Sequence, residues 1–401
     1  MPKTNTTRSD DALRRVWAIL EKAPLIDGHN DLPMVIRADP VAQGDIARFR
    51  LDEEHGSGDT DIPRLRRGGV SGQIWAAFTP SESKHPALWT LEQIDLILRM
   101  QEAFPDIFVS ALDADDVLRA KREGKIASIV AVEGAIGLEN SLAPLRVWFA
   151  AGVRLVTLCH NGTLDWVDSA TDLPRSGGLS PFGRDVVREL NRLGMMVDCA
   201  HVSTDVMHQV LDISTAPIVF SHSNARALCQ HPRNVPDDVL ARLPANDGLI
   251  MATFVPHFVS EETRRWITPL RRQASVTLGA DWTDRLRAYE AEHGPAPAAT
   301  LEQVADHICY LADKVGAHRL GIGSDFWGGP DNPAGLEDVS RFPHLLAEMV
   351  MRGWSDDHVA GLAGLNFLRV FRAVDHEGQR LRSLARRGKG APGEMLAAPA
   401  G

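Results

Sequence analysis

Eight short apolar runs, separated by segments of helical length, constrain the fold of this 401-residue chain more than any other feature. The runs are rich in β-branched residues and are bounded by turn residues, as strands are. Most of them are continuously apolar rather than alternating, which is typical of parallel strands buried on both faces. The eight runs are 24–27, 70–78, 126–132, 153–158, 195–199, 217–220, 249–255 and 320–323.

Strands that alternate with helices favour a parallel α/β architecture, and eight of them predict a (β/α)₈ TIM barrel. An open doubly wound sheet is the alternative that the pattern leaves. Residues 256–319 form a long insertion between strands 7 and 8, because connections in such folds are usually a few residues long. We expect a single domain over residues 1–380. Residues 381–401 are rich in Arg, Gly, Ala and Pro, and we expect this tail to be disordered.

The composition excludes several classes of protein. The 43 Lys and Arg residues against 53 Asp and Glu give a formal charge of −10, which argues against a basic nucleic-acid binder. The apolar runs are strand-sized, so we expect no transmembrane helix and no membrane partner. The N-terminus lacks the apolar core of a secretory signal. Four cysteines without a CxxC pair indicate reduced thiols, and we therefore predict a cytoplasmic location.

Histidine and carboxylate residues stand where six of the eight runs end, and no Lys or Arg does. The reactive groups of a parallel barrel gather at the carboxyl ends of its strands. His29 and Asp31 lie two residues apart in an extended segment, so both can face one metal ion. The other strand-end residues are Glu133, His160, His201, His222 and Asp325.

Imidazole and carboxylate groups are ligands that zinc prefers. Each residue taken alone has an ordinary structural alternative: Glu133 also fits a helix N-cap or a buried ion pair, and a single strand-end histidine is more often structural. Taken together, three histidines and two carboxylates suffice for two metal ions if one carboxylate bridges them. The candidate ligands are His29, Asp31, Glu133, His201 and His222.

The sequence resembles the membrane (renal) dipeptidase family of zinc peptidases, which belongs to the amidohydrolase-type metal-dependent barrels. The matching segments follow the family's order over most of residues 24–330. They are IDGHNDLP (26–33), GGVSGQIWA (68–76), VEGA (132–135), GVRLVTLCHN (152–161), VDCAHVS (197–203), PIVFSHSNAR (217–226), RNVPDD (233–238) and GIGSDF (321–326).

The resemblance implies two zinc ions per chain, and family members are often homodimers. One zinc would be held by His29 and Asp31, and the other by His201 and His222. Glu133 would bridge them. Two ions about 3.5–4 Å apart can share a water and convert it to a bridging hydroxide at neutral pH.

The resemblance also implies three residues that act on the substrate. Asp325 would lie at the attacking water, where a carboxylate can take the proton and pass it to the leaving amine. His160 would lie beside the scissile carbonyl, where it can stabilise the oxyanion. Arg233 would grip the substrate carboxylate by two parallel hydrogen bonds. Without the resemblance, an ion pair of Arg233 with Asp237 or Asp238 is an alternative.

We predict a metallo-dipeptidase that hydrolyses dipeptides, L-Xaa-D-Xaa substrates included. Three departures from the family leave the substrate open: Trp327 replaces an aspartate, Val255 replaces a tyrosine of some members, and Asn161 follows His160 directly. The alternative is hydrolysis of another amide, such as an N-acyl amino acid, a lactam or a peptide-derived natural product, on the same binuclear site. A barrel that only binds a ligand is the non-enzyme alternative, and the complete set of implied ligands argues against it.

Overall fold

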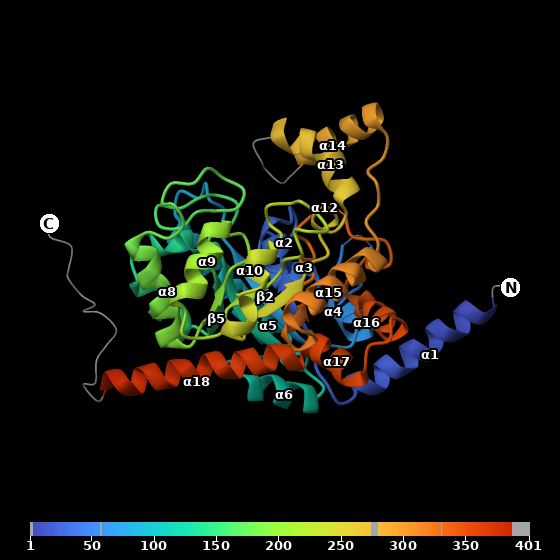
Figure 1. Ribbon diagram of the computed structural model, residues 1–401, viewed down its shortest axis with the longest axis horizontal. Helices are drawn as coiled ribbons and strands as arrows, with labels where there is room; N and C mark the ends of the chain where they lie inside the picture. Colours follow the sequence, from blue (N-terminus) through green and yellow to red (C-terminus); the bar gives the residue numbers. More distant parts are fainter. Residues whose placement is uncertain (1–2, 57, 274–279, 330, 387–401) are drawn as a thin grey trace.

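Eight parallel strands close into a barrel that helices surround (Figure 1). The computed structural model describes residues 3–56, 58–273, 280–329 and 331–386. Each strand pairs with the next around the barrel, and the last pairs back with the first. The predicted TIM barrel is therefore confirmed, and the open doubly wound sheet is excluded. The barrel strands are β1 (Leu25–Asn30), β2 (Val70–Phe78), β4 (Ile126–Glu133), β5 (Val153–Thr157), β6 (Met196–Asp198), β7 (Val219–Phe220), β8 (Leu249–Ala252) and β9 (Leu320–Ile322).

One further strand, β3 (Phe108–Ser110), was not predicted because three residues carry too little pattern. β3 pairs with the start of β4, from Phe108 opposite Ile126 onward. β5 joins β4 only from Val130. β3 therefore borders the early part of β4 without interrupting the closure of the barrel.

Helices and 3₁₀ turns lie before, between and after the barrel strands, and the bounds of most of them follow. They are α1 (Lys3–Leu20), α2 (Leu32–Ala38), α3 (Ile46–Phe49), α4 (Ile62–Arg67), α5 (Pro86–Ala103), α6 (Ala114–Arg122), η1 (Ala135–Leu138), α7 (Ala143–Ala150), α8 (Pro181–Leu193), α9 (Thr204–Ile213), α10 (Asp237–Leu240), α11 (Leu243–Asn246), α16 (Phe342–Met351), α17 (Asp356–Ala360) and α18 (Asn366–Arg386).

The 256–319 insertion divides into an arm and an ordinary barrel helix. The arm holds α13 (Glu261–Gln273) and α14 (Ala280–His293), which project from the barrel beyond α12 (Pro256–Val259) (Figure 1). Its buried residues Ile267 and Leu270 form a cluster separate from the main core. The predicted helix Leu301–Val315 is confirmed as α15, which begins with a capping box between Thr300 and Gln303.

Two boundaries differ from the sequence-based expectation. The first run was predicted to end at Asp27, but β1 continues to Asn30. Glycine permits this close packing, because a Cβ on Gly28 would lie 2.6 Å from the Met251 sulfur. At the other end α18 extends to Arg386 and so includes the first six residues of the tail that we expect to be disordered. Residues 387–401 lie outside the described residues.

Apolar side chains of the strands pack against α18 in the core. Ile74, Ile129 and Met251 belong to one buried cluster with Phe367 and Phe371 of α18, and α18 runs along one side of the barrel in Figure 1. The four cysteines are free thiols. Among the described residues, no helix combines the length and the apolar character that a membrane span requires.

Candidate metal centre

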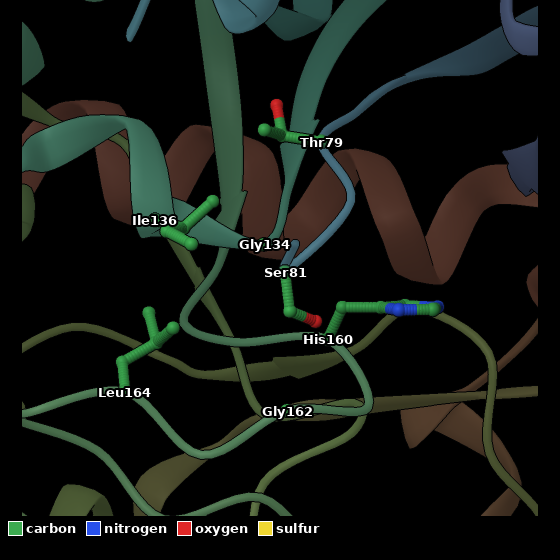
Figure 2. Close-up of a pocket in the computed structure, with 7 residues that line it drawn as sticks. All are labelled: Thr79, Ser81, Gly134, Ile136, His160, Gly162 and Leu164. Carbon is green, nitrogen blue, oxygen red and sulfur yellow. The ribbon is translucent and has the colours of Figure 1, made fainter. Parts of the chain in front are cut away.

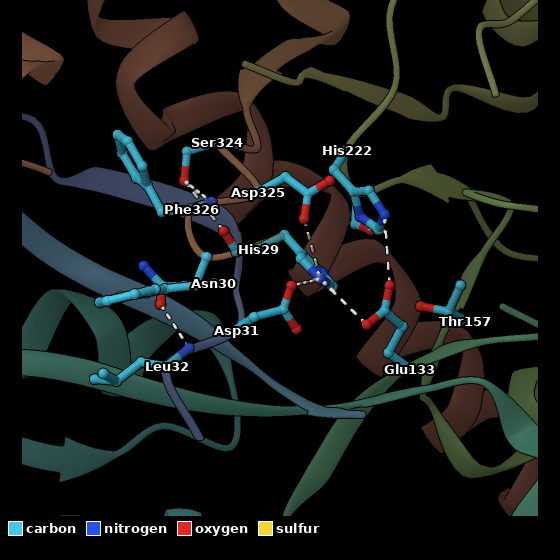
Figure 3. Close-up of polar contacts among 12 residues, drawn as sticks. His29, Asn30, Asp31, Leu32, Glu133, Thr157, His222, Ser324, Asp325 and Phe326 are labelled. Atoms are coloured by element: carbon cyan, nitrogen blue, oxygen red, sulfur yellow. Dashed lines mark hydrogen bonds and ion pairs between the residues drawn. The ribbon is translucent and has the colours of Figure 1, made fainter. Parts of the chain in front are cut away.

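The strand-end residues converge at the carboxyl end of the barrel (Figure 3). The first group is centred on His29, whose Nε2 lies 3.7 Å from Asp31 Oδ2, 3.9 Å from Asp325 Oδ1 and 3.5 Å from Glu133 Oε2. His29 is 1% exposed, and neither of its ring nitrogens has a hydrogen-bond partner among the described residues. This group therefore presents nitrogen and oxygen donors to one point without satisfying them internally.

The second group lies on the other side of Glu133. His201 Nε2 is 3.0 Å from Glu133 Oε1 and 3.0 Å from His222 Nε2. His222 Nε2 is 3.6 Å from the same carboxylate oxygen. Glu133 thus turns one oxygen toward each group, which is the arrangement of a bridging carboxylate.

The spacing of these donors fits a pair of divalent metal ions. Two ligand atoms bound ~2.0–2.1 Å from one tetrahedral zinc are ~3.3 Å apart. The measured separations scatter about that value, from 3.0 to 3.9 Å. The donors are imidazole nitrogens and carboxylate oxygens, which suit zinc. A cation would also satisfy the buried Nε2 of His29, which otherwise carries a desolvation penalty.

The carboxylates of the cluster are buried close together, and burial is the main cause of their pKa shifts. Burial raises the pKa of Glu133 and raises the pKa of Asp325 well above its ordinary value. Burial lowers the pKa of His29, but the charges of Glu133 and Asp31 reverse this, and the pKa lies well above its ordinary value. Metal cations placed here would neutralise the carboxylates and let His29 bind through a neutral imidazole.

His160 lies beside the second group, with its ring centroid 4.3 Å from that of His201 and 4.6 Å from that of Phe78. Burial, together with the charge of Arg233, lowers the pKa of His160 to about 3, so the imidazole is neutral at pH 7. Figure 2 shows this ring extending away from Ile136 and Leu164, which line a small pocket at its base. A ligand atom of His160 also lies within 4.8 Å of those of Glu133 and His201.

Arg233 is a buried cation without an internal partner. Its side chain is 1% exposed, and none of its three guanidinium nitrogens has a hydrogen-bond partner among the described residues. Its Cζ lies over the ring of Phe258, 5.4 Å from the centroid. A buried guanidinium whose N–H donors make no hydrogen bond within the described residues indicates an anionic ligand.

The alternative ion pair of Arg233 is wrong, because its two candidate partners are engaged elsewhere. Asp237 accepts hydrogen bonds from Tyr310 and Lys314. Asp238 lies 3.0 Å from Nε2 of His208.

Two site residues have left-handed backbone conformations, with φ of +71° at His201 and +65° at Asp325. Such conformations cost roughly 1–3 kcal/mol in residues other than glycine. Backbone hydrogen bonds hold both: Asp325 N–H donates to the carbonyl of His29, and the His201 carbonyl accepts from Ala170 N–H. The loops therefore hold the side chains of His201 and Asp325 in the site despite the free-energy cost of their left-handed backbone conformations.

Sequence reasoning missed the buried polar residues beneath the ligands. Asp27 accepts hydrogen bonds from Ser324 N–H at 2.7 Å, from Ser324 Oγ at 2.8 Å and from Gln73 Nε2 at 2.8 Å. Burial raises the pKa of Asp27 to about 6. Asp198 occupies the same kind of position in β6. The available signal was an aspartate within an otherwise apolar strand, since such a carboxylate needs partners.

The structure shows the surroundings of the three residues that depart from the family's sequence pattern, which are Trp327, Asn161 and Val255. Trp327 donates its backbone N–H to Asp59 Oδ2 at 2.9 Å, and its ring is so close to Gly58 that a Cβ there would lie 2.3 Å from it. Asn161 Oδ1 lies 3.2 Å from His201 Nδ1, so this asparagine supports a candidate ligand of the second group. Val255 is buried, with 6% of its surface exposed.

Comparison with known proteins agrees with the geometry. The membrane dipeptidase family (peptidase family M19) matches residues 13–384. An uncharacterized dipeptidase of Schizosaccharomyces pombe is 37% identical over 384 residues, covering 92% of this chain and 85% of that protein.

Two solved structures extend the comparison to three dimensions. The probable dipeptidase PvdM from Pseudomonas aeruginosa has a TM-score of 0.79 and 27% identity over 92% of this chain and 99% of that one. The dipeptidase AC, a metallo peptidase of family M19, has a TM-score of 0.73 and 25% identity over 88% of this chain and 98% of that one. The chain therefore belongs to the membrane dipeptidase family, peptidase family M19, as a metallo-dipeptidase hydrolase.

Proposed function

We propose that the protein hydrolyses the peptide bond of dipeptides, L-Xaa-D-Xaa substrates among them, with two zinc ions. The observation that carries the proposal is the division of the Glu133 oxygens between two donor groups. It supports His29 and Asp31 as ligands of one ion, and His201 and His222 as ligands of the other. Two bound cations would polarise the scissile carbonyl and lower the pKa of a shared water.

The residues around the ligands supply the remaining chemistry. Asp325 Oδ1 lies 3.9 Å from His29 Nε2, and Asp325 would take the proton of the attacking water and deliver it to the leaving amine. His160, neutral at pH 7, would donate a hydrogen bond to the carbonyl oxygen as negative charge develops there. Arg233 would pair with the free carboxylate of the substrate, which selects short peptides that end near the site.

Metal content and substrate profile, measured together, test the proposal. We expect two zinc ions per chain. We also expect hydrolysis of dipeptides, tested on a panel that includes an L-Xaa-D-Xaa series, and this hydrolysis should stop when a chelator is added. The activity should return when zinc is restored. Turnover that survives complete removal of metal would contradict the mechanism.

A second candidate reaction is hydrolysis of another amide on the same centre. The observation in its favour is Trp327, which stands two residues after Asp325 where the family has an aspartate and whose ring lies against Gly58. A panel of N-acyl amino acids and lactams assayed beside the dipeptides distinguishes the two reactions by kcat/KM. The cytoplasmic location and the homodimer stay predictions.

A further inference from the structure

A buried chain of hydrogen bonds reaches His222 from the wall of the barrel. Asp198 is fully buried, and its Oδ1 accepts from the backbone N–H groups of Ser221 at 2.9 Å and Ala200 at 3.0 Å. Its Oδ2 accepts from two hydroxyls, Ser221 Oγ and Thr157 Oγ1, each at 2.6 Å. Ser221 Oγ in turn lies 2.8 Å from Nδ1 of His222.

The single hydroxyl hydrogen of Ser221 fixes the direction of this chain. An ionised carboxylate only accepts hydrogen bonds, and a separation of 2.6 Å is that of a strong, charge-assisted O–H···O⁻ bond. Ser221 therefore donates to Asp198, and its oxygen is left to accept at His222. The Nδ1 of His222 must then carry the ring proton, which leaves a lone pair on Nε2.

We propose that Asp198 and Ser221 are positioning residues that hold His222 in the Nδ1–H tautomer, with its Nε2 lone pair directed toward the metal centre. The inference rests on the proposed function in that the Nε2 lone pair is what a metal ion would use. Partners that fix the tautomer of a histidine ligand in this way also raise its basicity.

His201 is held in the same tautomer by a different residue. Asn161 Oδ1 lies 3.2 Å from its Nδ1, and the Thr171 hydroxyl lies 3.0 Å from the Asn161 backbone carbonyl oxygen and 3.4 Å from Asn161 Oδ1. Both imidazoles then present lone pairs at Nε2 atoms that are only 3.0 Å apart. Two lone pairs at this distance repel, so the pair forms a cation-binding element rather than a hydrogen bond.

Thr157 offers a matched control because it donates to the same carboxylate oxygen at the same distance, and among the hydrogen bonds of the described residues none joins it to His222. Thr157→Val removes one hydrogen bond to Asp198 and should leave the tautomer of His222 unchanged. Ser221→Ala removes the hydroxyl that connects Asp198 to His222. Asp198→Asn tests the direction of the chain. Its amide oxygen must face the two backbone N–H groups, so its NH₂ faces Ser221. The Ser221 hydroxyl then turns to donate to Nδ1, and the ring proton of His222 moves to Nε2.

The first readout is zinc binding to the metal-free proteins, measured by competition with a chromophoric chelator. We expect Ser221→Ala and Asp198→Asn to lower the affinity for one of the two zinc ions about 10- to 100-fold. Thr157→Val should bind both zinc ions with wild-type affinity. Equal weakening by Ser221→Ala and Thr157→Val would show a merely structural role and overturn the proposal. Wild-type affinity in Asp198→Asn would overturn it as well.

The second readout needs no metal. The ring ¹⁵N resonances of metal-free, ¹⁵N-histidine-labelled protein report which nitrogen carries the proton, and His222→Asn assigns the signals. We expect a protonated Nδ1 in the wild type and a protonated Nε2 in Asp198→Asn; the opposite result in either protein overturns the inference. A wild type that binds no zinc would refute the proposed function, while this measurement would still decide the tautomer. Thermal unfolding of each variant identifies those that fail to fold.

Discussion

Arg233 allows the sharpest test of how this site selects its substrate. Its guanidinium is buried with three nitrogens that have no hydrogen-bond partner among the described residues, so no hydrogen bond offsets the desolvation of its charge. Replacing it with methionine would leave a substrate carboxylate buried without a counter-ion. Breaking a buried pair in this way costs about 3–5 kcal/mol, which lowers kcat/KM about 150- to 5,000-fold. Arg233→Lys keeps the positive charge but cannot form two parallel hydrogen bonds to a carboxylate. We therefore expect a smaller loss of kcat/KM, about 10- to 150-fold.

The assay compares a dipeptide with its C-terminal amide in both enzymes. In the wild type the amide should be the poorer substrate by a similar factor, because it lacks the carboxylate. In Arg233→Met the two substrates should differ little, since the partner of the carboxylate is gone. This double-mutant cycle isolates the pairing from any general damage to the site.

Protein stability gives the control and the refutation. A buried, unpaired cation destabilises the folded state, so Arg233→Met should raise Tm in the absence of substrate. If Arg233→Met still prefers the free acid over the amide by the wild-type factor, the assignment of Arg233 to the substrate carboxylate is refuted.

Three further predictions follow from the site and its surroundings. Asp325→Asn should lower kcat about 10²- to 10⁴-fold while two zinc ions stay bound; loss of metal in this variant would make Asp325 a ligand instead. Chelation should lower Tm as well as abolish activity, because zinc at a hundredfold excess over Kd stabilises the folded state by about 2.7 kcal/mol per site; an unchanged Tm would argue against these ligands. His307 is buried, and burial lowers its pKa from 6.5 to about 4; the unfolded chain then binds more protons between these pH values, so about 3 kcal/mol of stability is lost as the pH falls through this window. His307→Gln should flatten that part of the pH–stability curve measured by urea unfolding, and an unchanged slope would contradict this assignment.

The sequence predicts the strands and the strand-end residues well because both depend on local pattern. Long apolar runs such as 126–132 can only be buried strands here, and a histidine or carboxylate that ends such a run needs a partner. β3 could not be predicted in the same way, since its three residues are defined by pairing with β4 rather than by their own composition. The end of β1 was misjudged because Gly28 breaks the apolar pattern, although packing against Met251 requires a glycine there.

The supporting residues were missed for a different reason. Asp198, Ser221 and Thr157 lie on three neighbouring strands or strand ends, and the pairing of those strands brings each hydroxyl oxygen to 2.6 Å from Asp198 Oδ2. No spacing along the chain encodes such a contact. The same holds for Arg233, whose lack of a partner is a property of its buried surroundings and not of the RNVPDD segment.

The narrowness of the barrel at Gly28 has a practical consequence for engineering. A Cβ at Gly28 would lie 2.7 Å from the Ser221 carbonyl oxygen, and one at Gly323 only 1.8 Å from it. Libraries aimed at new substrates should therefore leave these two positions fixed as glycine.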